Sequence, residues 1–146
     1  MNQLKSFFKA TVPKRYIPEL REFRDFIRGL FYIGNLFICP VCGGNFRKFR
    51  DFGAVSKANE QCPRCLSLKR HRLLWLYLKE KTNFFDDNLK VLHIAPEYYF
   101  YQKFSKQKNL DYISADIQSP LAKVKMDITN IVYEDNLFDV IFAIAS

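Results

Sequence analysis

The sequence predicts an α/β protein in which a small cysteine-rich module precedes a parallel sheet. Two CxxC pairs, at residues 39–42 and 62–65, predict the module. The sheet is predicted by an apolar run at Val91–Ala95, a tight turn into a helical segment, and a second strand that leads into Asp116. This order, with an acid about 20 residues past the turn, is typical of the first half of a Rossmann-like sheet. Such sheets bind ligands beyond the carboxyl ends of their strands.

Composition and charge divide the chain into unequal halves. Of its 146 residues, 49% are hydrophobic and 16% aromatic, enough to pack the core of one domain, or of one domain plus a small module. Residues 1–80 carry 16 Lys/Arg against 6 Asp/Glu, whereas residues 81–146 carry 7 against 9. A basic front half is typical of a protein that meets nucleic acid, an anionic membrane surface or another polyanion. The alternative is that these charges only keep the module in solution.

The sequence shows neither a secretory signal at its N-terminus nor an apolar run long enough to span a membrane. Met1–Lys9 has neither an apolar core nor a small-residue cleavage site of the kind a secretory signal needs. The longest apolar region, Leu30–Ile38, is interrupted by Gly34-Asn35 and is too short to span a bilayer. We therefore expect a cytoplasmic protein without a transmembrane segment.

Residues 1–35 are expected to form a basic, helical N-terminal segment. Within it, Glu19–Phe31 is predicted to be a helix, because apolar residues recur at helical spacing and arginines fall on its other side. The apolar positions are Leu20, Phe23, Phe26, Ile27 and Leu30, and the basic ones are Arg21, Arg24 and Arg28. We favour a helix that packs on its own domain. A helix lying on a membrane surface is the alternative, so peripheral membrane contact of the N-terminus is a candidate interaction.

Residues 36–66 are predicted to form a zinc ribbon whose ligands are Cys39, Cys42, Cys62 and Cys65. Each CxxC turn presents two thiolates to one ion, and two turns complete a tetrahedron. Four thiolates leave no open position, so the Zn2+ is expected to be structural. A disulfide pair and a redox centre are the alternatives, which a cytosolic location disfavours. The segment 45–60 is expected to form short strands with Phe46, Phe49 and Phe52 as a small core.

Basic residues interleave with those aromatic residues, which makes nucleic acid a candidate partner of the ribbon. The basic positions are Arg47, Lys48, Arg50 and Lys57. Basic and aromatic side chains together can grip a phosphate chain and stack on bases. The alternative, which we prefer, is that the phenylalanines are core and the charges face solvent.

Residues 67–88 are expected to connect the ribbon to the sheet, mostly as a helix over Leu66–Lys81. A wide apolar stripe supports the helix, made by Leu68, Leu73, Leu74, Leu76, Tyr77 and Leu78. Four basic residues, 69–72, crowd its first turn, where positive charge is unfavourable. That conflict predicts an acidic partner, either a neighbouring surface or a substrate anion.

Residues 89–146 are expected to hold the cofactor-binding part of the sheet. The glycine-rich turn of a dinucleotide site is absent, since Ala95, Pro96 and Glu97 stand in its place. Proline offers no N–H and Glu97 adds negative charge, so a pyrophosphate is a poor guest there. A ligand with ribose hydroxyls for Asp116 and a cationic head fits better, and S-adenosyl-L-methionine has both. Glu97 has two candidate roles: a carboxylate near the ammonium of that cofactor, or an acid at a helix N-terminus.

These residues carry a resemblance to a known family. VLHIAPE at 91–97, YISADI at 112–117 and VKMDITNIVYEDNLFDVIF at 124–142 resemble the cofactor-binding half of class I S-adenosylmethionine-dependent methyltransferases. The chain is most similar to a bacterial subgroup with LHIAPE in place of the glycine-rich turn, an upstream CPxC pair and an RHRLLW-like helix. The resemblance implies a methyltransferase of unknown acceptor and places Asp127 beside the adenine amino group. An Asx turn or helix cap is the alternative role of Asp127.

The resemblance also implies about three further strands beyond Ser146, so we expect a C-terminally truncated chain. Its sheet is expected to need its missing half or self-association, because an apolar edge strand invites pairing. No general base can be named, and activity of these residues alone is not expected. The alternative function is a zinc-ribbon nucleic-acid-binding module with a degenerate Rossmann-like platform. A redox protein that uses the CxxC pairs is a weaker third.

Overall fold

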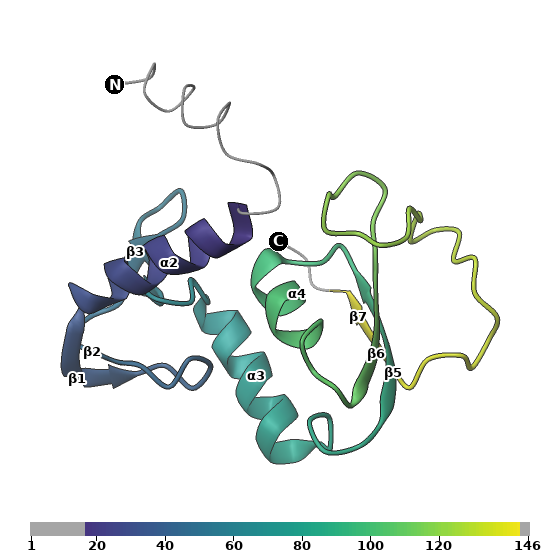
Figure 1. Cartoon of the computed structure of the whole chain (residues 1–146), viewed down its shortest axis with the longest axis horizontal. Coiled ribbons are helices and arrows are strands. Elements are labelled where there is room, and N and C mark those ends of the chain that lie inside the picture. The colour runs from purple at the N-terminus through teal and green to yellow at the C-terminus, as the bar shows by residue number, and fades with distance from the viewer. Residues whose placement is uncertain (1–16, 144–146) are drawn as a thin grey trace. The chain divides into compact units, whose positions relative to one another are not determined.

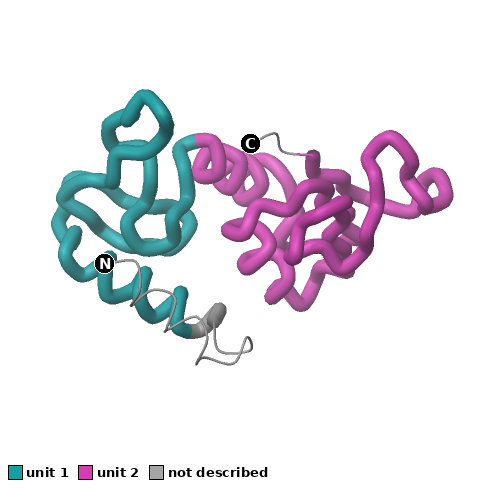
Figure 2. Tube along the Cα trace, turned by 90° about the horizontal axis from the view of Figure 1, so that it is seen from above, with its two compact units in different colours: residues 1–69 teal, residues 70–146 magenta. Residues whose placement is uncertain are grey.

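The computed structural model describes residues 17–143 as a mixed α/β protein with several small sheets (Figure 1). The chain divides into two compact units, residues 1–69 (unit 1) and residues 70–146 (unit 2), coloured separately in Figure 2. The predicted α/β class is confirmed at this level. The cysteines lie at positions 39–65, after a helix, rather than at the start of the chain.

Over its described residues, 17–69, unit 1 contains one helix and two short antiparallel hairpins. Its elements are α2 (Ile17–Leu30), β1 (Ile33–Ile38), β2 (Asn45–Phe46), β3 (Arg50–Phe52) and β4 (Lys57–Gln61). β1 pairs with β2, and β3 pairs with β4. Strands of two to six residues are too short to build a large core. The hairpins instead place the two CxxC turns, which follow β1 and β4, close to each other.

The hydrophobic interior of unit 1 is small and aromatic. Phe46 and Phe49 are buried, with ring centroids 5.9 Å apart, and Phe37 lies 5.3 Å from Phe49. Phe52 is 45% exposed, so the expectation that all three ribbon phenylalanines are core is wrong for this one. Its strand, β3, lies in a separate two-stranded sheet with β4, and its last two residues, Asp51 and Phe52, are exposed.

The helix α3 (Lys69–Lys81) begins three residues later than the sequence predicts. The reason is local: Leu66 has φ +62°, outside the helical region, because it closes the second CxxC turn. The buried residues of α3 are His71, Arg72 and Leu78, and of the predicted apolar stripe only Leu78 and, just before the helix, Leu68 are fully buried. Leu73 and Tyr77, which belong to that stripe, are 70% and 56% exposed.

Unit 2 is built around a three-stranded parallel sheet with the order β6-β5-β7. The elements are β5 (Leu89–Ile94), α4 (Tyr98–Phe104), β6 (Leu110–Ala115) and β7 (Val140–Ala143). A parallel bridge between Ala115 and Val124 extends the sheet beyond β6, so the chain moves outward before it returns as β7 on the other side of β5. Asp139 fixes that return, since its carboxylate accepts a 2.7 Å hydrogen bond from the Lys90 backbone N–H.

The two faces of this sheet have different cores, as the alternation of strand side chains requires. On one face an aromatic cluster forms from Phe84, Phe100, Phe104, Tyr112, Phe142 and His93, with ring centroids about 5–6 Å apart. On the other face an aliphatic cluster contains Leu92, Ile94, Ala115 and Met126. The aliphatic face is covered by the long loop between β6 and β7, which contributes Met126. In Figure 1 this loop is drawn in yellow-green and lies on the opposite side of the sheet from α4.

Candidate functional site: a four-cysteine cluster and a cavity at the strand ends

The two CxxC turns of unit 1 have the same backbone structure. In the first, the Gly43 N–H donates to the Cys39 carbonyl at 2.9 Å, and the Cys39 N–H donates to the Gly44 carbonyl at 3.0 Å. In the second, Leu66 donates to Cys62 at 3.0 Å and Cys62 donates to Ser67 at 2.9 Å. Gly43 and Leu66 both have positive φ, +66° and +62°. Glycine adopts such a φ at little cost, whereas Leu66 takes the same conformation with strain at the second turn.

The four cysteine sulfurs form a cluster with metal-binding geometry. All four Sγ atoms lie within 4.8 Å of one another, and the pairs Cys39–Cys65 and Cys42–Cys62 are 3.6 and 3.8 Å apart. A disulfide bond is about 2.05 Å long, so no pair is bonded. Four thiolates at about 2.3 Å from one zinc ion lie about 3.8 Å apart, which these distances match. The donor set therefore fits one tetrahedral, thiolate-binding metal ion.

A serine that the sequence analysis did not single out completes the surroundings of the sulfurs. Ser67 is fully buried, and its Oγ lies 3.2 Å from the Sγ of Cys65 and 3.6 Å from the Sγ of Cys39. A hydroxyl donor stabilises negative charge on the sulfur that accepts from it. Without a metal the four thiols compete for protons: contacts with the other cysteines lower the pKa of Cys39, whereas contacts with Cys39 and Cys42 raise the pKa of Cys62 and Cys65. The available signal in the sequence was the position of Ser67, two residues after the last cysteine.

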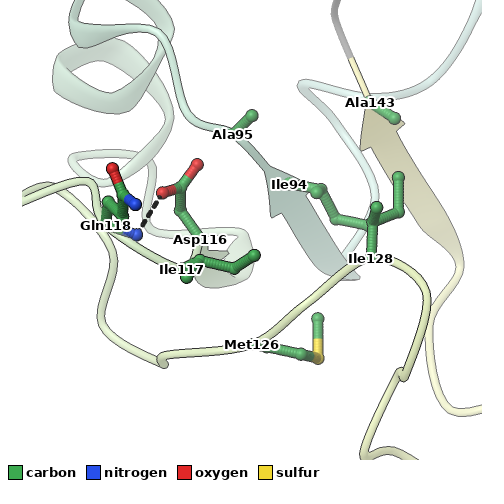
Figure 3. A pocket seen from close by; sticks show the side chains of 8 residues that line it. All are labelled: Ile94, Ala95, Asp116, Ile117, Gln118, Met126, Ile128 and Ala143. Atoms are coloured by element: carbon green, nitrogen blue, oxygen red, sulfur yellow. Dashed lines mark hydrogen bonds between the residues drawn. The ribbon is translucent and has the colours of Figure 1, made fainter.

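Unit 2 has a cavity of about 500 Å³ at the carboxyl ends of its strands (Figure 3). Every strand of the sheet contributes to it: Ile94 and Ala95 at the end of β5, Asp116 after β6, and Ala143 at the end of β7. The long loop adds the apolar side chains Ile117, Met126 and Ile128, together with Gln118. The cavity lies where the chain, after moving outward from β5 through β6, crosses back to β7. That reversal is the usual ligand position in an open parallel sheet.

Asp116 is the charged residue among those that line the cavity. Its Oδ1 accepts hydrogen bonds from the backbone N–H groups of Ser119, at 2.6 Å, and Gln118, at 2.7 Å. These two bonds lower the pKa of Asp116, so the carboxylate is ionised at neutral pH. Within the described part of the chain, Oδ2 has no hydrogen-bond partner. A rigidly held carboxylate thus keeps one oxygen for a donor from a ligand.

Ala95 lies at the bend that replaces the glycine-rich turn. It has φ +50°, a left-handed conformation that costs a residue with a side chain about 1–2 kcal/mol. The Ala95 N–H donates to the Ala115 carbonyl at 2.9 Å, which holds the bend against the neighbouring strand. Strained backbone of this kind concentrates at binding sites, and here the strained residue also lines the cavity.

Glu97, predicted to be near the cofactor, contacts α3 instead of lining the cavity. Its carboxylate makes a 3.2 Å ion pair with Arg70, and His71 Nε2 lies 3.0 Å from Oε1 and 2.9 Å from Oε2. Burial raises the pKa of Glu97, but the hydrogen bonds and charges of His71 and Arg70 outweigh it and lower the pKa overall. Glu97 is the N-cap of α4 without making a side-chain cap bond. It is therefore an acidic partner of the kind that the basic start of α3 predicted.

Asp127 also lies outside the lining of the cavity, although its neighbours Met126 and Ile128 belong to it. It is exposed, and its Oδ1 accepts from the Thr129 backbone N–H at 2.9 Å and from the Thr129 hydroxyl at 2.8 Å. These bonds form the Asx turn that was the alternative interpretation of this residue. The structure thus brings Ala95 and Asp116 together at one cavity and leaves Glu97 and Asp127 outside its lining.

Comparison with known proteins adds no relative: no protein-family model, curated protein or solved structure matches this chain. Among the residues that the structure describes, every helix is too short or too polar to cross a membrane.

Proposed function

We propose that unit 2 is the cofactor-binding part of an S-adenosylmethionine-dependent methyltransferase, and that unit 1 is a zinc-stabilised module attached to it. The observation that carries the proposal is the cavity at the carboxyl ends of β5, β6 and β7, with one free oxygen of Asp116 directed to it. A volume of about 500 Å³ suits a ligand of the size of a nucleoside derivative.

The order of the strands supports this assignment. Counting the Val124 bridge, the order Val124-β6-β5-β7 corresponds to 3-2-1-4, the first four strands of a doubly wound sheet of the Rossmann type. The three parallel strands and the crossover through α4 belong to the same pattern. In such sheets the acid after the second strand holds the ribose hydroxyls. Asp116 occupies that position.

The chemistry of the cavity fits a nucleoside with a cationic tail better than a dinucleotide. Its apolar side chains, Ile94, Ile117, Met126 and Ile128, suit the faces of a planar base. Asp116 offers an acceptor for hydroxyl donors, and the bend at Ala95-Pro96 lacks the run of N–H groups that a pyrophosphate requires. When bound, S-adenosylmethionine supplies an activated methyl group. These residues position the nucleoside and keep water from its base.

The four-cysteine cluster is proposed to hold zinc in a structural role. Zinc prefers four thiolates in a tetrahedron, and all four protein ligands are present, so no position is left for a substrate. The alternative function, nucleic-acid binding by the ribbon, has less support. Phe46 and Phe49 are buried and therefore cannot stack on bases, which leaves Phe52 as the exposed ribbon aromatic among the three.

Calorimetric titration of S-adenosylhomocysteine into the full chain tests the proposal. Asp116→Asn is the decisive variant, because asparagine keeps an oxygen for the Gln118 and Ser119 N–H groups but replaces the free carboxylate oxygen with a donor. Loss of a charge-assisted hydrogen bond predicts affinity about 10- to 100-fold weaker. Asp111→Asn, in the exposed part of β6, is the matched control and should leave the affinity unchanged.

Two results would contradict the proposal: no heat from the unmodified chain, or equal affinities of the Asp116→Asn and Asp111→Asn chains. The same titration with Asp127→Asn decides whether that acid takes part. Unchanged affinity is expected from its Asx turn, whereas the resemblance to the methyltransferase family implies weaker binding.

A further inference from the structure

Unit 1 leaves a large apolar surface exposed on α2 and β1. On α2, Leu20, Phe23, Phe26, Ile27 and Leu30 are all more than a third exposed, and Phe31 follows at 72%. Positions 20, 23, 27, 30 and 31 recur at helical spacing and so lie along one side of the helix. Three side chains of β1 continue the exposed series: Ile33, Leu36 and Ile38, with Leu36 at 78%. We call these nine residues the apolar face of unit 1.

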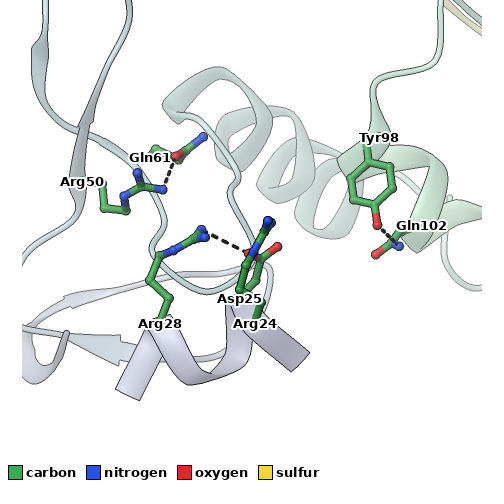
Figure 4. Close-up of polar contacts among 7 residues, drawn as sticks. All are labelled: Arg24, Asp25, Arg28, Arg50, Gln61, Tyr98 and Gln102. Carbon is green, nitrogen blue, oxygen red and sulfur yellow. Dashed lines mark hydrogen bonds and ion pairs between the residues drawn. The ribbon is translucent and has the colours of Figure 1, made fainter. Parts of the chain in front are cut away.

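The opposite side of α2 is the one that packs on unit 1. Asp25 is buried and makes ion pairs with Arg24 at 2.9 Å and Arg28 at 3.1 Å (Figure 4). One turn later, a Cβ at Gly29 would lie 3.0 Å from the Cβ of Arg64, so only a small residue fits there. A narrow stripe of polar and small residues therefore holds the helix in place. The sequence predicts a helix that packs on its own domain; α2 does so through this stripe, while its apolar side chains stay exposed.

The unit that carries the apolar face also carries the positive charge of the chain. Residues 1–69 contain 13 Lys/Arg and 5 Asp/Glu, a net charge of +8, whereas residues 70–146 contain 10 of each and are neutral. The whole formal charge of the chain thus belongs to the unit that carries this face. On α2 itself, Arg21, Arg24 and Arg28 lie along one border of the apolar side, but the helix also contains three acids, Glu19, Glu22 and Asp25, so the excess of positive charge comes from the rest of unit 1. A fitting partner therefore has an apolar layer, which contacts the apolar face, and next to it an anionic layer, which attracts the positive charge of unit 1.

We propose that the apolar face of unit 1 docks on the surface of an anionic lipid bilayer, with α2 lying in the interface plane. Phenylalanine, leucine and isoleucine side chains enter the acyl boundary, and the net positive charge of unit 1 attracts it to the lipid phosphates. A second copy of the chain is a poor occupant, because it would bring two units of charge +8 together. Nucleic acid is a poor occupant as well, since six of the nine exposed residues are aliphatic and cannot stack on bases as aromatic rings do.

This inference is independent of the proposed methyltransferase activity, since none of the nine residues belongs to unit 2. It adds a location to that activity: the chemistry of unit 2 would take place close to a membrane surface. The full chain should therefore bind vesicles with or without S-adenosylhomocysteine.

Co-sedimentation of the full-length protein with phosphatidylcholine vesicles, with and without 30% phosphatidylglycerol, tests the proposal. We expect binding to the anionic vesicles that weakens as salt is raised. The double variant Phe23→Ser/Leu30→Ser should bind at least tenfold more weakly, with unchanged circular dichroism and metal content. Val55→Ser is the matched control, because Val55 is 84% exposed in unit 1 but lies outside α2 and β1. It should bind as the unmodified chain does.

Three outcomes would overturn the proposal. The first is no binding to anionic vesicles. The second is equal loss of binding in Val55→Ser and in the double variant. The third is binding to RNA, or a concentration-dependent dimer, that the Phe23→Ser/Leu30→Ser substitutions abolish while vesicle binding stays unchanged.

Discussion

The two units of this chain solve the problem of stability in different ways. Unit 1 buries few hydrophobic side chains, chiefly Phe46 and Phe49. It also contains the cluster of four cysteines. Unit 2 buries a continuous set of aromatic and aliphatic residues on both faces of a parallel sheet. A module with so little core needs another source of stability, and a bound metal is the usual one. From this comparison we propose that unit 1 depends on metal binding for its stability whereas unit 2 depends on packing.

The two units differ in the same way in what they present to the outside. Unit 1 carries the net charge and leaves apolar residues of α2 and β1 exposed. Unit 2 is electrically neutral, and its exposed apolar side chains, such as Leu73, Val132 and Ile141, are scattered over a helix, a loop and a strand. These surface properties are the basis for proposing that unit 1 docks on a membrane and that unit 2 binds a ligand.

Metal removal should produce the largest difference between the units. Structural zinc contributes about 10–16 kcal/mol to the folding of small zinc modules, more than the stability of a domain this small, so chelation should unfold unit 1. The single tryptophan, Trp75, packs on Phe85 and Phe104 in unit 2, and its emission should not change. Amide NMR spectra of the full chain before and after chelation measure both effects, with zinc-saturated chelator as the control. Survival of dispersed unit 1 signals in metal-free protein would contradict the account.

Truncation of a buried aromatic side chain in unit 2 should destabilise unit 2 and leave unit 1 folded. Phe104 is fully buried and packs on Phe84, Phe100 and Phe142, so Phe104→Ala should destabilise unit 2 by about 3–5 kcal/mol. Urea unfolding followed by Trp75 emission measures the loss, and the zinc content should stay the same. Leu73→Ala is the control, because Leu73 is exposed on α3 and its loss should cost less than about 0.5 kcal/mol. Loss of zinc in the Phe104 variant would show that the units do not fold independently.

Acid should weaken unit 2 through His93. Burial lowers the pKa of His93 from 6.5 to about 4. The unfolded chain therefore binds a proton at this residue between those pH values and the folded chain does not, so stability is complete above about pH 6.5 and falls as the pH drops toward 4. The difference in pKa corresponds to about 3 kcal/mol. Urea unfolding at pH 7, 6 and 5, followed by Trp75, should show the decline in the unmodified chain and a much smaller one in His93→Gln. Parallel pH profiles would disprove the assignment.

The paired CxxC turns give the smallest and most local test. Gly43→Ala places a Cβ in open space at φ +66°, so its cost is purely conformational, about 1 kcal/mol. Leu66→Gly removes a half-buried side chain but also relieves the same backbone strain at the equivalent position. Its net loss of stability should therefore be smaller than the loss of the side chain alone would cause. Zinc affinity measured by competition with a chromophoric chelator should fall in Gly43→Ala. An unchanged affinity would mean that the first turn does not need its left-handed residue.

The sequence predicted the features that depend on local spacing. The CxxC pairs, the α3 helix and the strands around Val91 and Tyr112 are encoded by neighbouring residues, and the structure confirms them. Features that depend on tertiary packing were not predicted. The helical spacing of Leu20 and Phe23 shows that α2 has an apolar side, but which side packs is decided by Asp25 and Gly29 against Arg64. Ser67 and the Glu97–His71 pair required knowledge of which turns and helices meet.

The candidate cavity was half predicted, for the same reason. Asp116 and Ala95 follow directly from strands, so their position at a carboxyl end is a consequence of the strand pattern. Met126 and Ile128 line the cavity because the long loop folds back on the sheet, and no periodicity in the sequence reports that path.

Amide NMR of the full chain during addition of S-adenosylhomocysteine tests the central claim most directly, because it shows which unit holds the ligand and where. The account predicts chemical-shift changes that centre on Ala95, Asp116, Gln118 and Met126 and leave residues 17–69 unaffected. Shift changes confined to unit 1, or a spectrum that does not change at saturating ligand, would contradict it.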